Sequence, residues 1–237
     1  MQHYFGKIQG NEAMLGPEEA HHLLNVRRAN LGEAIEVGDG ESVFECKVVS
    51  LNPLRIAVIK EIEERRELPC EVTLAFSWLK GDHNELIVLK GTELGIKHFA
   101  PFISERTVAR PEGKEKNKID RLRKIAEEGT KQCRRAEVPS VEEFVSYGQI
   151  LAKKADHKVL AYEGMAGDSR SLLKALSSVR PGESILFVVG PEGGFSEKEA
   201  KMALEAGFSF VSLGGRILRA ETAAIYGASV ISASVEE

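Results

Sequence analysis

The sequence predicts an α/β fold with a parallel sheet, preceded by a smaller β-rich unit. After residue 70, short apolar runs of the kind that buried parallel strands require alternate with segments of helical period. These runs are VTLAF at 72–76, KVLAY at 158–162 and SILFVV at 184–189. Before residue 69, polar and apolar residues alternate instead, as they do in half-buried strands. The 237 residues are enough for two domains, which we expect at 1–68 and 69–237.

Within the first 68 residues, the pattern predicts β-strands and one short helix. Residues 43–49 interleave apolar and polar side chains. Gly38-Asp39-Gly40 before them is typical of a tight turn, because glycine reaches positive φ freely. Gly16-Pro17-Glu18-Glu19 predicts a helix start, since proline suits the first turn and carboxylates suit the positive end of the helix dipole. The charged stretch Lys60–Glu67, followed by Pro69, predicts the boundary to the second domain.

The last third of the chain contains a βαβ unit. ILFVV, GPEGGF, SEKEAKMALEAG and FVSL follow one another as strand, loop, helix and strand. Ser196 and Glu199 form a capping box at the start of that helix, and Gly207 stands where a left-handed glycine would end it. A second helix is predicted between the first two apolar runs by one apolar stripe at helical period. Its residues are Ile119, Leu122, Ala126, Gly129 and Cys133.

The charge is unevenly distributed along the chain. The net charge of −4 argues against a uniformly basic nucleic-acid coat protein. Residues 69–140 nevertheless hold 14 basic against 11 acidic side chains, whereas residues 1–68 hold 8 against 12 and residues 141–237 hold 10 against 13. Eleven of the cations lie between Arg106 and Arg135, beside six anions from Glu105 onward. This tract is either a solvated helix face or a surface that follows RNA phosphates.

Composition excludes several classes of protein. With 43% hydrophobic and 29% charged residues, the chain should fold into a globular protein. It has no apolar run near the ~18 residues of a membrane span, and MQHYFGKIQG at its start is no signal-peptide core. The three cysteines, Cys46, Cys70 and Cys133, are far apart and form no CxxC pair. We therefore expect a cytoplasmic protein without disulfides, metal or membrane partner.

Two glycine-rich loops are candidate ligand sites. Gly190–Gly194 follows one predicted strand and Leu213–Arg219 follows the next. Both lie at carboxyl ends of parallel strands, where α/β folds bind ligands. Neither loop contains a GxxxxGK[ST] or a GxGxxG with a later acidic residue, so phosphate binding is disfavoured. A planar group such as adenine, held by backbone atoms, fits better. The alternative for each loop is an ordinary tight turn.

The two loop motifs also carry a resemblance to a known family. GPEGGFSEKE at 190–199 followed by LGGRILRAETAA at 213–224 resembles the 16S ribosomal RNA uridine-N3 methyltransferases of the SPOUT superfamily. The resemblance extends over nearly the whole chain. HHLLNVRR at 21–28 matches the family's PUA-like RNA-binding barrel, and KGDHNELIVLKGTELG at 80–95 and KIAEEGTKQCRRAEVP at 124–139 match its catalytic domain. Related ribose 2′-O-methyltransferases share GPEGG-like loops, but usually carry an asparagine- and serine-rich segment where this sequence has ILRAETA.

The resemblance implies a trefoil-knotted α/β domain that works as a homodimer and binds S-adenosylmethionine in the knot. It implies a donor site in the loop after KVLAY, in the GPEGG turn and in the LGGRILRAETAA segment. The implied residues are Leu160, Tyr162, Glu163, Gly164, Gly190, Pro191, Glu192, Gly193, Gly194, Leu213, Gly214, Ile217, Leu218, Arg219, Thr222 and Ala223. No metal is needed, because the positive sulfur already activates the methyl group.

We predict Arg219 and Glu221 as the catalytic residues. The uracil N3–H must lose its proton, and a guanidinium can stabilise negative charge on the uracil carbonyl oxygens. Arg219 is the first choice for this role and Arg216 the second. Glu221 would orient the arginine or relay the proton. The alternative is that Arg219 and Glu221 form a structural ion pair or a helix-cap pair.

The implied partner is ribosomal RNA or the small ribosomal subunit. Candidate RNA-binding residues are Arg27, Arg28, Arg106, Lys131, Arg134 and Arg135. The target uridine must be unpaired or flipped out, since a base pair buries its N3. Two other functions remain open: a SPOUT methyltransferase for another RNA atom, such as the ribose 2′-O, and a non-catalytic RNA-binding assembly factor.

Overall fold

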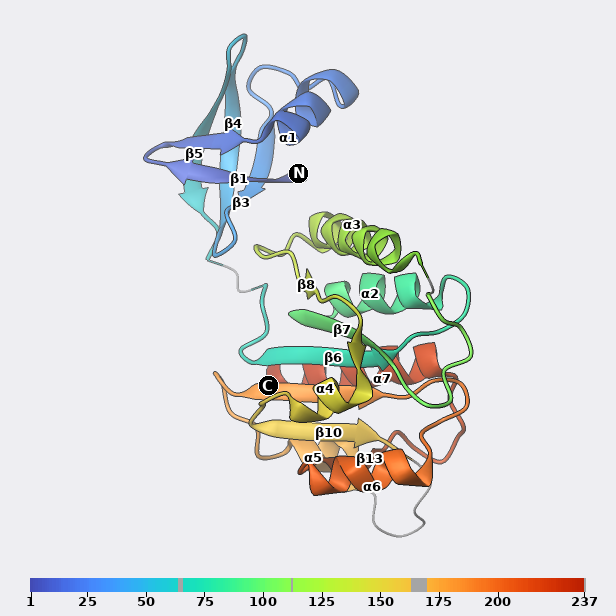
Figure 1. Ribbon diagram of the computed structural model, residues 1–237. Helices are drawn as coiled ribbons and strands as arrows, with labels where there is room; N and C mark the ends of the chain where they lie inside the picture. The colour runs from blue at the N-terminus through green and yellow to red at the C-terminus, as the bar shows by residue number, and fades with distance from the viewer. Residues whose placement is uncertain (64–65, 112, 163–169, 237) are drawn as a thin grey trace. The chain divides into compact units, whose positions relative to one another are not determined.

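A closed five-stranded barrel forms the core of the first of two units in the chain (Figure 1). The computed structural model describes residues 1–237 except 64–65, 112, 163–169 and 237. The first unit comprises Met1–Glu67 and Thr130–Val138, and the second comprises Leu68–Gly129 and Pro139–Glu237. This division differs from the predicted limits, 1–68 and 69–237, mainly by the segment Thr130–Val138, which belongs with the barrel.

The barrel has the strand order β1-β2-β5-β4-β3. Its strands are β1 (Gln2–Gln9), β2 (Glu12–Leu15), β3 (Ala34–Gly38), β4 (Val43–Leu51) and β5 (Leu54–Glu61). Neighbours are antiparallel except β1 and β3, whose parallel pairing closes the barrel. The predicted alternation is confirmed in β4, where Cys46 and Val48 are fully buried in the barrel core. Burial raises the pKa of the Cys46 thiol to about 11.

The predicted helix start at Pro17 is also confirmed. Helix α1 (Pro17–His21) has Gly16 as its N-cap and proline in its first turn. It continues into a wider π-helical turn, η1 (His22–Val26), which the sequence pattern did not reveal. The chain leaves this turn through Arg27 and Arg28, and Arg28 has a left-handed φ of 53°.

A buried carboxylate joins three parts of the first unit. Glu36 on β3 is 2% exposed, and one of its oxygens accepts a hydrogen bond from Arg66 Nη1 at 2.9 Å. Arg134 Nη1 lies 3.4 Å from the other oxygen, and His3 Nδ1 lies 3.5 Å from the carboxylate. Burial alone would raise the pKa of Glu36, but the hydrogen bond and charge of Arg66 hold it below its usual value. Burial also lowers the pKa of His3.

Eight parallel strands form the sheet of the second unit, in the order β11-β13-β10-β12-β6-β7-β8, with β9 also paired to β7. The strands are β6 (Glu71–Ser77), β7 (His98–Ile103), β8 (Ser140–Val141), β9 (Val145–Ser146), β10 (His157–Ala161), β11 (Arg170–Ser171), β12 (Ser184–Val189) and β13 (Ser209–Ser212). The helices are α2 (His83–Glu93), α3 (Glu115–Cys133), α4 (Tyr147–Ala152), α5 (Leu172–Leu176), α6 (Glu197–Glu205) and α7 (Ala220–Glu236). All the predicted strands and both predicted helices are present.

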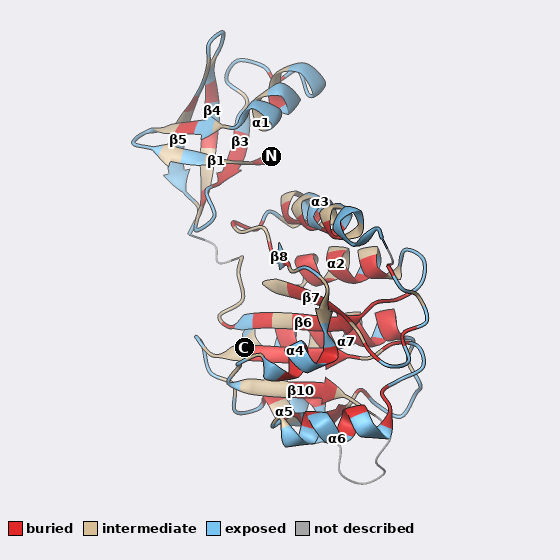
Figure 2. Cartoon of the chain, in the orientation of Figure 1, coloured by how far each residue is buried: buried red, intermediate tan, exposed pale blue. Residues whose placement is uncertain are grey.

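Helices cover both faces of the sheet. Helices α4 and α6 share one core cluster with β7, β10 and β12, and α7 packs against α2 and α5 and against β6 and β12. Buried residues therefore follow the strands and the sheet-facing sides of the helices (Figure 2). Helix α7 lies so close to β12 that a Cβ on Gly227 would come within 2.2 Å of the Phe187 ring. A glycine at position 227 is thus required by packing.

A barrel followed by a parallel-sheet α/β domain is the fold that the sequence predicted, and it is confirmed. The trefoil knot stays a prediction. Among the described residues, no group of three or more His, Cys, Asp and Glu side chains is placed to hold a metal. None of the described helices is both long enough and apolar enough to cross a membrane.

We expect the ion pairs of Glu36 to stabilise the barrel. Glu36→Gln should lower its free energy of unfolding by about 3 kcal/mol at neutral pH, because breaking a buried ion pair leaves a buried charge uncompensated. Since folding lowers the pKa of Glu36 from 4.5, its contribution is complete above that pH and disappears as the pH falls through the folded-state pKa. Amide hydrogen exchange of the barrel strands measures the loss.

Glu45→Gln is the matched control. Glu45 pairs with Lys60 at 3.5 Å on the barrel surface, where the lysine side chain is 67% exposed. Such a pair contributes less than about 1 kcal/mol. Equal losses in the two variants would contradict the role given to Glu36.

Candidate cofactor and catalytic site

A cavity of about 840 Å³ lies at the carboxyl edge of the sheet in the second unit. The loops that follow β7, β10, β12 and β13 contribute to it, together with the start of helix α2 after β6. Its lining includes His83, Arg106, Ala161, Tyr162, Val189, the run Gly190–Phe195, Glu197, Val211, Leu213 and the run Ile217–Glu221 with Ala223. The two glycine-rich loops that the sequence singled out therefore meet in one site.

Local conformation explains the glycines of the first loop. A Cβ on Gly190 would lie 2.9 Å from the Phe195 ring, and Gly194 has a φ of +66°. A side chain at either position would be strained. Helix α6 then begins at the predicted capping box, in which Ser196 Oγ accepts from the backbone N–H of Glu199 at 3.2 Å and the Glu199 carboxylate accepts from that of Ser196 at 2.9 Å.

The carboxylate of Glu199 also holds the loop after β7, which forms another wall of the cavity. Its other oxygen accepts a hydrogen bond from the backbone N–H of Glu105 at 2.8 Å, and Glu199 is only 5% exposed. Ser196 Oγ in turn donates to Glu105 Oε2 at 2.8 Å. The neighbouring Arg106 can therefore reach the GPEGG loop, where its Nη1 donates to the carbonyl of Gly193 at 3.1 Å.

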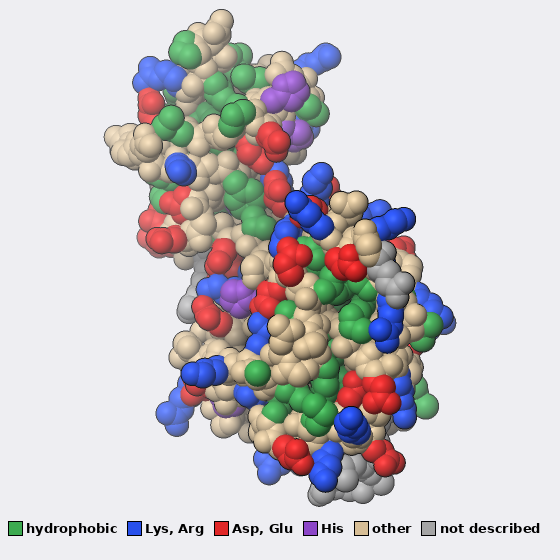
Figure 3. All heavy atoms as spheres, in the orientation of Figure 1, with side chains coloured by type: hydrophobic (Ala, Val, Ile, Leu, Met, Phe, Trp, Pro, Cys, Tyr) green, Lys and Arg blue, Asp and Glu red, His purple; other side chains and the backbone are tan. Residues whose placement is uncertain are grey.

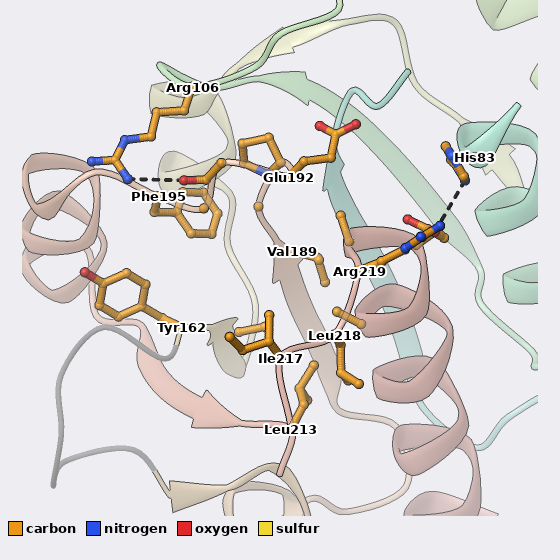
Figure 4. A pocket seen from close by; sticks show the side chains of 18 of the residues that line it. His83, Arg106, Tyr162, Val189, Glu192, Phe195, Leu213, Ile217, Leu218 and Arg219 are labelled. Atoms are coloured by element: carbon orange, nitrogen blue, oxygen red, sulfur yellow. Dashed lines mark hydrogen bonds and ion pairs between the residues drawn. The ribbon is translucent and has the colours of Figure 1, made fainter. Parts of the chain in front are cut away.

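The cavity has an apolar side and a polar side (Figure 4). The side chains of Tyr162, Leu213 and Ile217 lie along one side, and those of Arg106, Glu192 and His83 lie along the other. Ile217 is 93% exposed, which is unusual for an aliphatic side chain. The apolar side suits a planar ring, and the carboxylates of the lining suit a positively charged group.

Glu221 lies at the beginning of α7, where the helix dipole favours a carboxylate. Its Oε1 is 3.5 Å from Nδ1 of His83, and its side chain is 11% exposed. Arg219 lines the same cavity, but among the described residues Glu221 forms its ion pair with His83 and not with Arg219. The ion pair between Arg219 and Glu221 that the sequence offered as an alternative is thus not found among the described residues.

Some of the residues predicted to bind the methyl donor do not line the cavity. Leu160 is fully buried in the core of the sheet, and Gly214 and Thr222 do not line the cavity. Gly214 has a φ of +111°, so it serves the turn itself. Glu163 and Gly164 fall outside the described residues.

The predicted RNA-binding residues divide into two groups. Arg27, Arg28 and Arg134 are exposed, and Lys131 forms an ion pair with Glu19 at 2.5 Å. Arg135 is 2% exposed, and its Nη2 lies 2.6 Å from Glu67 Oε2. The expectation of an RNA-facing Arg135 is therefore corrected: it is a buried arginine that fastens Thr130–Val138 to Glu67. Figure 3 shows cations interspersed with acidic side chains on one face of the molecule.

Sequence reasoning did not assign His83 and Arg106 to the cavity. Both follow strands of the sheet, β6 and β7, at the same edge as the glycine loops. Because ligands of open parallel sheets bind at that edge, the position of these strands was the signal that could have found them.

Two family models match the chain. The RNA methyltransferase domain matches residues 66–232, and the RNA methyltransferase PUA domain matches residues 15–61. The barrel, the parallel-sheet domain and its edge cavity thus define an RNA methyltransferase with an N-terminal PUA domain.

The relatives narrow this class to one family. Ribosomal RNA small subunit methyltransferase E of Bacillus subtilis is 39% identical over 250 residues, which cover 100% of this chain and 98% of the relative. The chain belongs to the ribosomal RNA small subunit methyltransferase E family. The resemblance that the sequence indicated is confirmed.

Solved structures agree with this placement. Ribosomal RNA small subunit methyltransferase E of Neisseria gonorrhoeae, bound to S-adenosyl methionine, is 29% identical with a TM-score of 0.81, over 98% of this chain and 96% of that one. A Legionella pneumophila protein in complex with the cofactor SAM is 26% identical with a TM-score of 0.83, over 99% of this chain and 98% of that one.

The bracing by Glu199 can be tested. Glu199→Ala should destabilise the second unit by about 1–3 kcal/mol more than Gln149→Ala, because it also leaves the N–H of Glu105 without its acceptor. Gln149 is the matched control, since its side chain completes a capping box in α4 with Ser146. Urea denaturation followed by circular dichroism measures both. Equal losses would mean that the bond to Glu105 contributes nothing.

Proposed function

We propose that this protein transfers a methyl group from S-adenosylmethionine to N3 of a uridine in small-subunit ribosomal RNA. The cavity carries this proposal, because both family-like loops meet in it at the carboxyl edge of the sheet. The relationship over the whole chain to ribosomal RNA small subunit methyltransferase E supports the substrate. The ILRAETA segment supports a base rather than the ribose as the methylated group.

The cavity residues fit S-adenosylmethionine. The apolar side, with Tyr162, Leu213, Ile217 and Leu218, would hold the adenine ring. The loop Gly190–Gly194 would bring backbone groups against the ligand. Three carboxylates in the lining, Glu192, Glu197 and Glu221, suit a ligand that carries a sulfonium and an ammonium. When bound, the cofactor supplies an activated methyl group.

The protein itself aligns the reactants and handles charge. Good alignment of two reactants can lower the activation free energy by roughly 7–11 kcal/mol. We assign Arg219 to stabilise negative charge on the uracil carbonyl oxygens, since it lines the cavity and is exposed. We assign Glu221 to the path by which the uracil N3 proton leaves, because its carboxylate lies beside His83.

We assign RNA binding to Arg27, Arg28, Lys131 and Arg134 in the first unit, and to Arg106 in the cavity. Arg28 and Arg134 support this assignment, since they are the non-glycine residues with positive φ, 53° and 60°, in the described part of the chain. Such a conformation costs roughly 1–2 kcal/mol, and backbone strain gathers at functional sites. The π-helical turn before Arg27 is a second irregularity of this kind.

A homodimer in the cytoplasm completes the proposal. Helix α7 carries an apolar ring that faces solvent outside the cavity, Tyr226, which is 43% exposed. A second copy of the chain would cover such a residue. Buried or half-buried thiols at Cys46, Cys70 and Cys133, with no disulfide among them, suit a reducing compartment.

The role of Arg219 predicts a large rate effect. Arg219→Ala should lower the methylation rate about 100- to 1,000-fold, as loss of an oxyanion donor does, while the affinity for S-adenosylmethionine changes little. Arg216→Ala is the control, because Arg216 is exposed and outside the cavity lining. Mass spectrometry of nucleosides from treated, undermodified small subunits measures the product, expected to be 3-methyluridine.

Other products would refute the proposal. A 2′-O-methylated nucleoside would assign the protein to another methyl acceptor. Tight binding of RNA without any methylated product would favour the assembly factor.

The assigned RNA-binding arginines predict a change in salt dependence. Arg27→Glu with Arg28→Glu should weaken RNA binding and flatten the log–log salt slope by about 0.7–0.9 for each phosphate that the variant no longer neutralises. Arg55→Glu is the control, since Arg55 lies on the same barrel and is paired with Glu12. Filter binding at salt concentrations from roughly 50 to 300 mM measures the slope. An unchanged slope would mean that these arginines contact solvent and not RNA phosphates.

A further inference from the structure

His83, the partner of Glu221, has no role of its own in the function proposed above. His83 begins α2, Glu221 lies in the first turn of α7, and His83 Nδ1 is 3.5 Å from Glu221 Oε1. Both side chains line the cavity. The histidine side chain is 38% exposed and the glutamate side chain 11% exposed. The imidazole thus faces the open space, and the carboxylate lies behind it.

The chain holds His83 on a rigid support. The neighbouring Asn84 is 1% exposed, and its side chain accepts from the backbone N–H of Leu79 at 2.9 Å and donates to the carbonyl of the same residue at 2.8 Å. This clamp closes the loop between β6 and α2. Helix α2 in turn packs against α7, which carries Glu221. The pair therefore does not depend on a mobile loop.

The charged groups near the pair lie at the start of α2, at the start of α7 and in the GPEGG loop. Glu221 is the charge in contact with His83, and Arg219 and Glu192 line the same cavity. Asp82 precedes His83 in the chain. Glu85 on the same helix forms an ion pair with Arg121 of α3, in which Glu85 Oε1 lies 2.7 Å from Arg121 Nε. Glu221 is thus the carboxylate placed to orient the imidazole.

We propose that His83 accepts the N3 proton of the target uridine and that Glu221 is the positioning residue that orients it. This inference rests on the proposed function. A histidine backed by a buried carboxylate is the arrangement of a general base with its orienting group. In unliganded proteins such contacts are often longer than in the reacting complex, so 3.5 Å suits the role.

The step balances without any further reactant. The N3–H bond breaks, and its proton goes to the free ring nitrogen of His83, Nε2. The electron pair left on N3 forms the new N3–C bond to the methyl group, and the S–C bond electrons stay on sulfur, which becomes neutral. His83 is then an imidazolium beside the Glu221 carboxylate, and it returns the proton to water after the product leaves.

A second histidine–glutamate pair provides a matched control. His157 Nε2 lies 2.8 Å from Glu183 Oε2 at the amino end of β10. Its side chain is 20% exposed, and it does not line the cavity. His157→Gln removes the same chemical group from the same domain without touching the site.

The experiment compares His83→Gln, His83→Asn and His157→Gln in single-turnover methylation of small subunits across a range of pH. Each His83 variant should lose about 100-fold or more in rate at neutral pH, the usual effect of a general base, and His157→Gln less than about twofold. The wild-type rate should reach a plateau as the pH rises. The variants should keep rising with pH, because hydroxide must then take the proton, so their deficit shrinks.

Two further readouts separate catalysis from structure. The affinity for S-adenosylmethionine, measured by calorimetry, should stay within about threefold in the His83 variants, since a base acts on the RNA. In the enzyme without donor or RNA, Glu221→Gln should change the imidazole NMR signals of His83 and leave those of His157 unchanged. The double variant His83→Gln with Glu221→Gln should be no slower than His83→Gln alone.

Several outcomes would overturn the inference. A His83 variant with a near-wild-type rate would do so, and so would a deficit that is constant across pH. If the wild-type protein were active but formed no 3-methyluridine, the proposed function would fail and this inference with it. An active wild type with the expected product and equally active His83 variants would remove this inference alone.

Discussion

All strands of the large sheet run in the same direction, and this constraint determines where the functional residues can lie. Each strand must end at the same edge, so the segments that follow five of them meet there. Residues as distant in the chain as His83 and Ala223 thereby line one cavity. Buried contacts then hold the loops in place. One of them is made by Glu199, whose carboxylate joins the Glu105 turn to the start of α6.

Features that depend on local backbone conformation could be predicted from the sequence. Glycines at 190 and 194 are required by a neighbouring ring and by a positive φ, and both requirements act within a few residues. The capping box of Ser196 and Glu199 and the terminating Gly207 are local in the same sense. For this reason the GPEGG loop, the following helix and the turn at Gly38–Gly40 could be read from a single sequence.

Features that depend on contacts between distant segments could not be predicted from the sequence. Arg135 belongs to a run of cations, and nothing near it in the chain shows that Glu67 buries it. The pairing of His83 with Glu221 brings together two helix starts that are far apart in the sequence. The two-residue strands β8 and β9 are too short for any periodicity. In each case contacts between distant segments decide the structure, and the local sequence pattern is compatible with more than one structure.

The exposure of Ile217 has a thermodynamic consequence. An aliphatic side chain that is 93% exposed on a cavity wall keeps water in contact with apolar surface while the site is empty. A flat ring placed over it would release that water. Burial of apolar surface lowers the heat capacity. Ligand binding at this wall should therefore become more exothermic as the temperature rises, and the slope of that change reports how much of the wall the ligand covers.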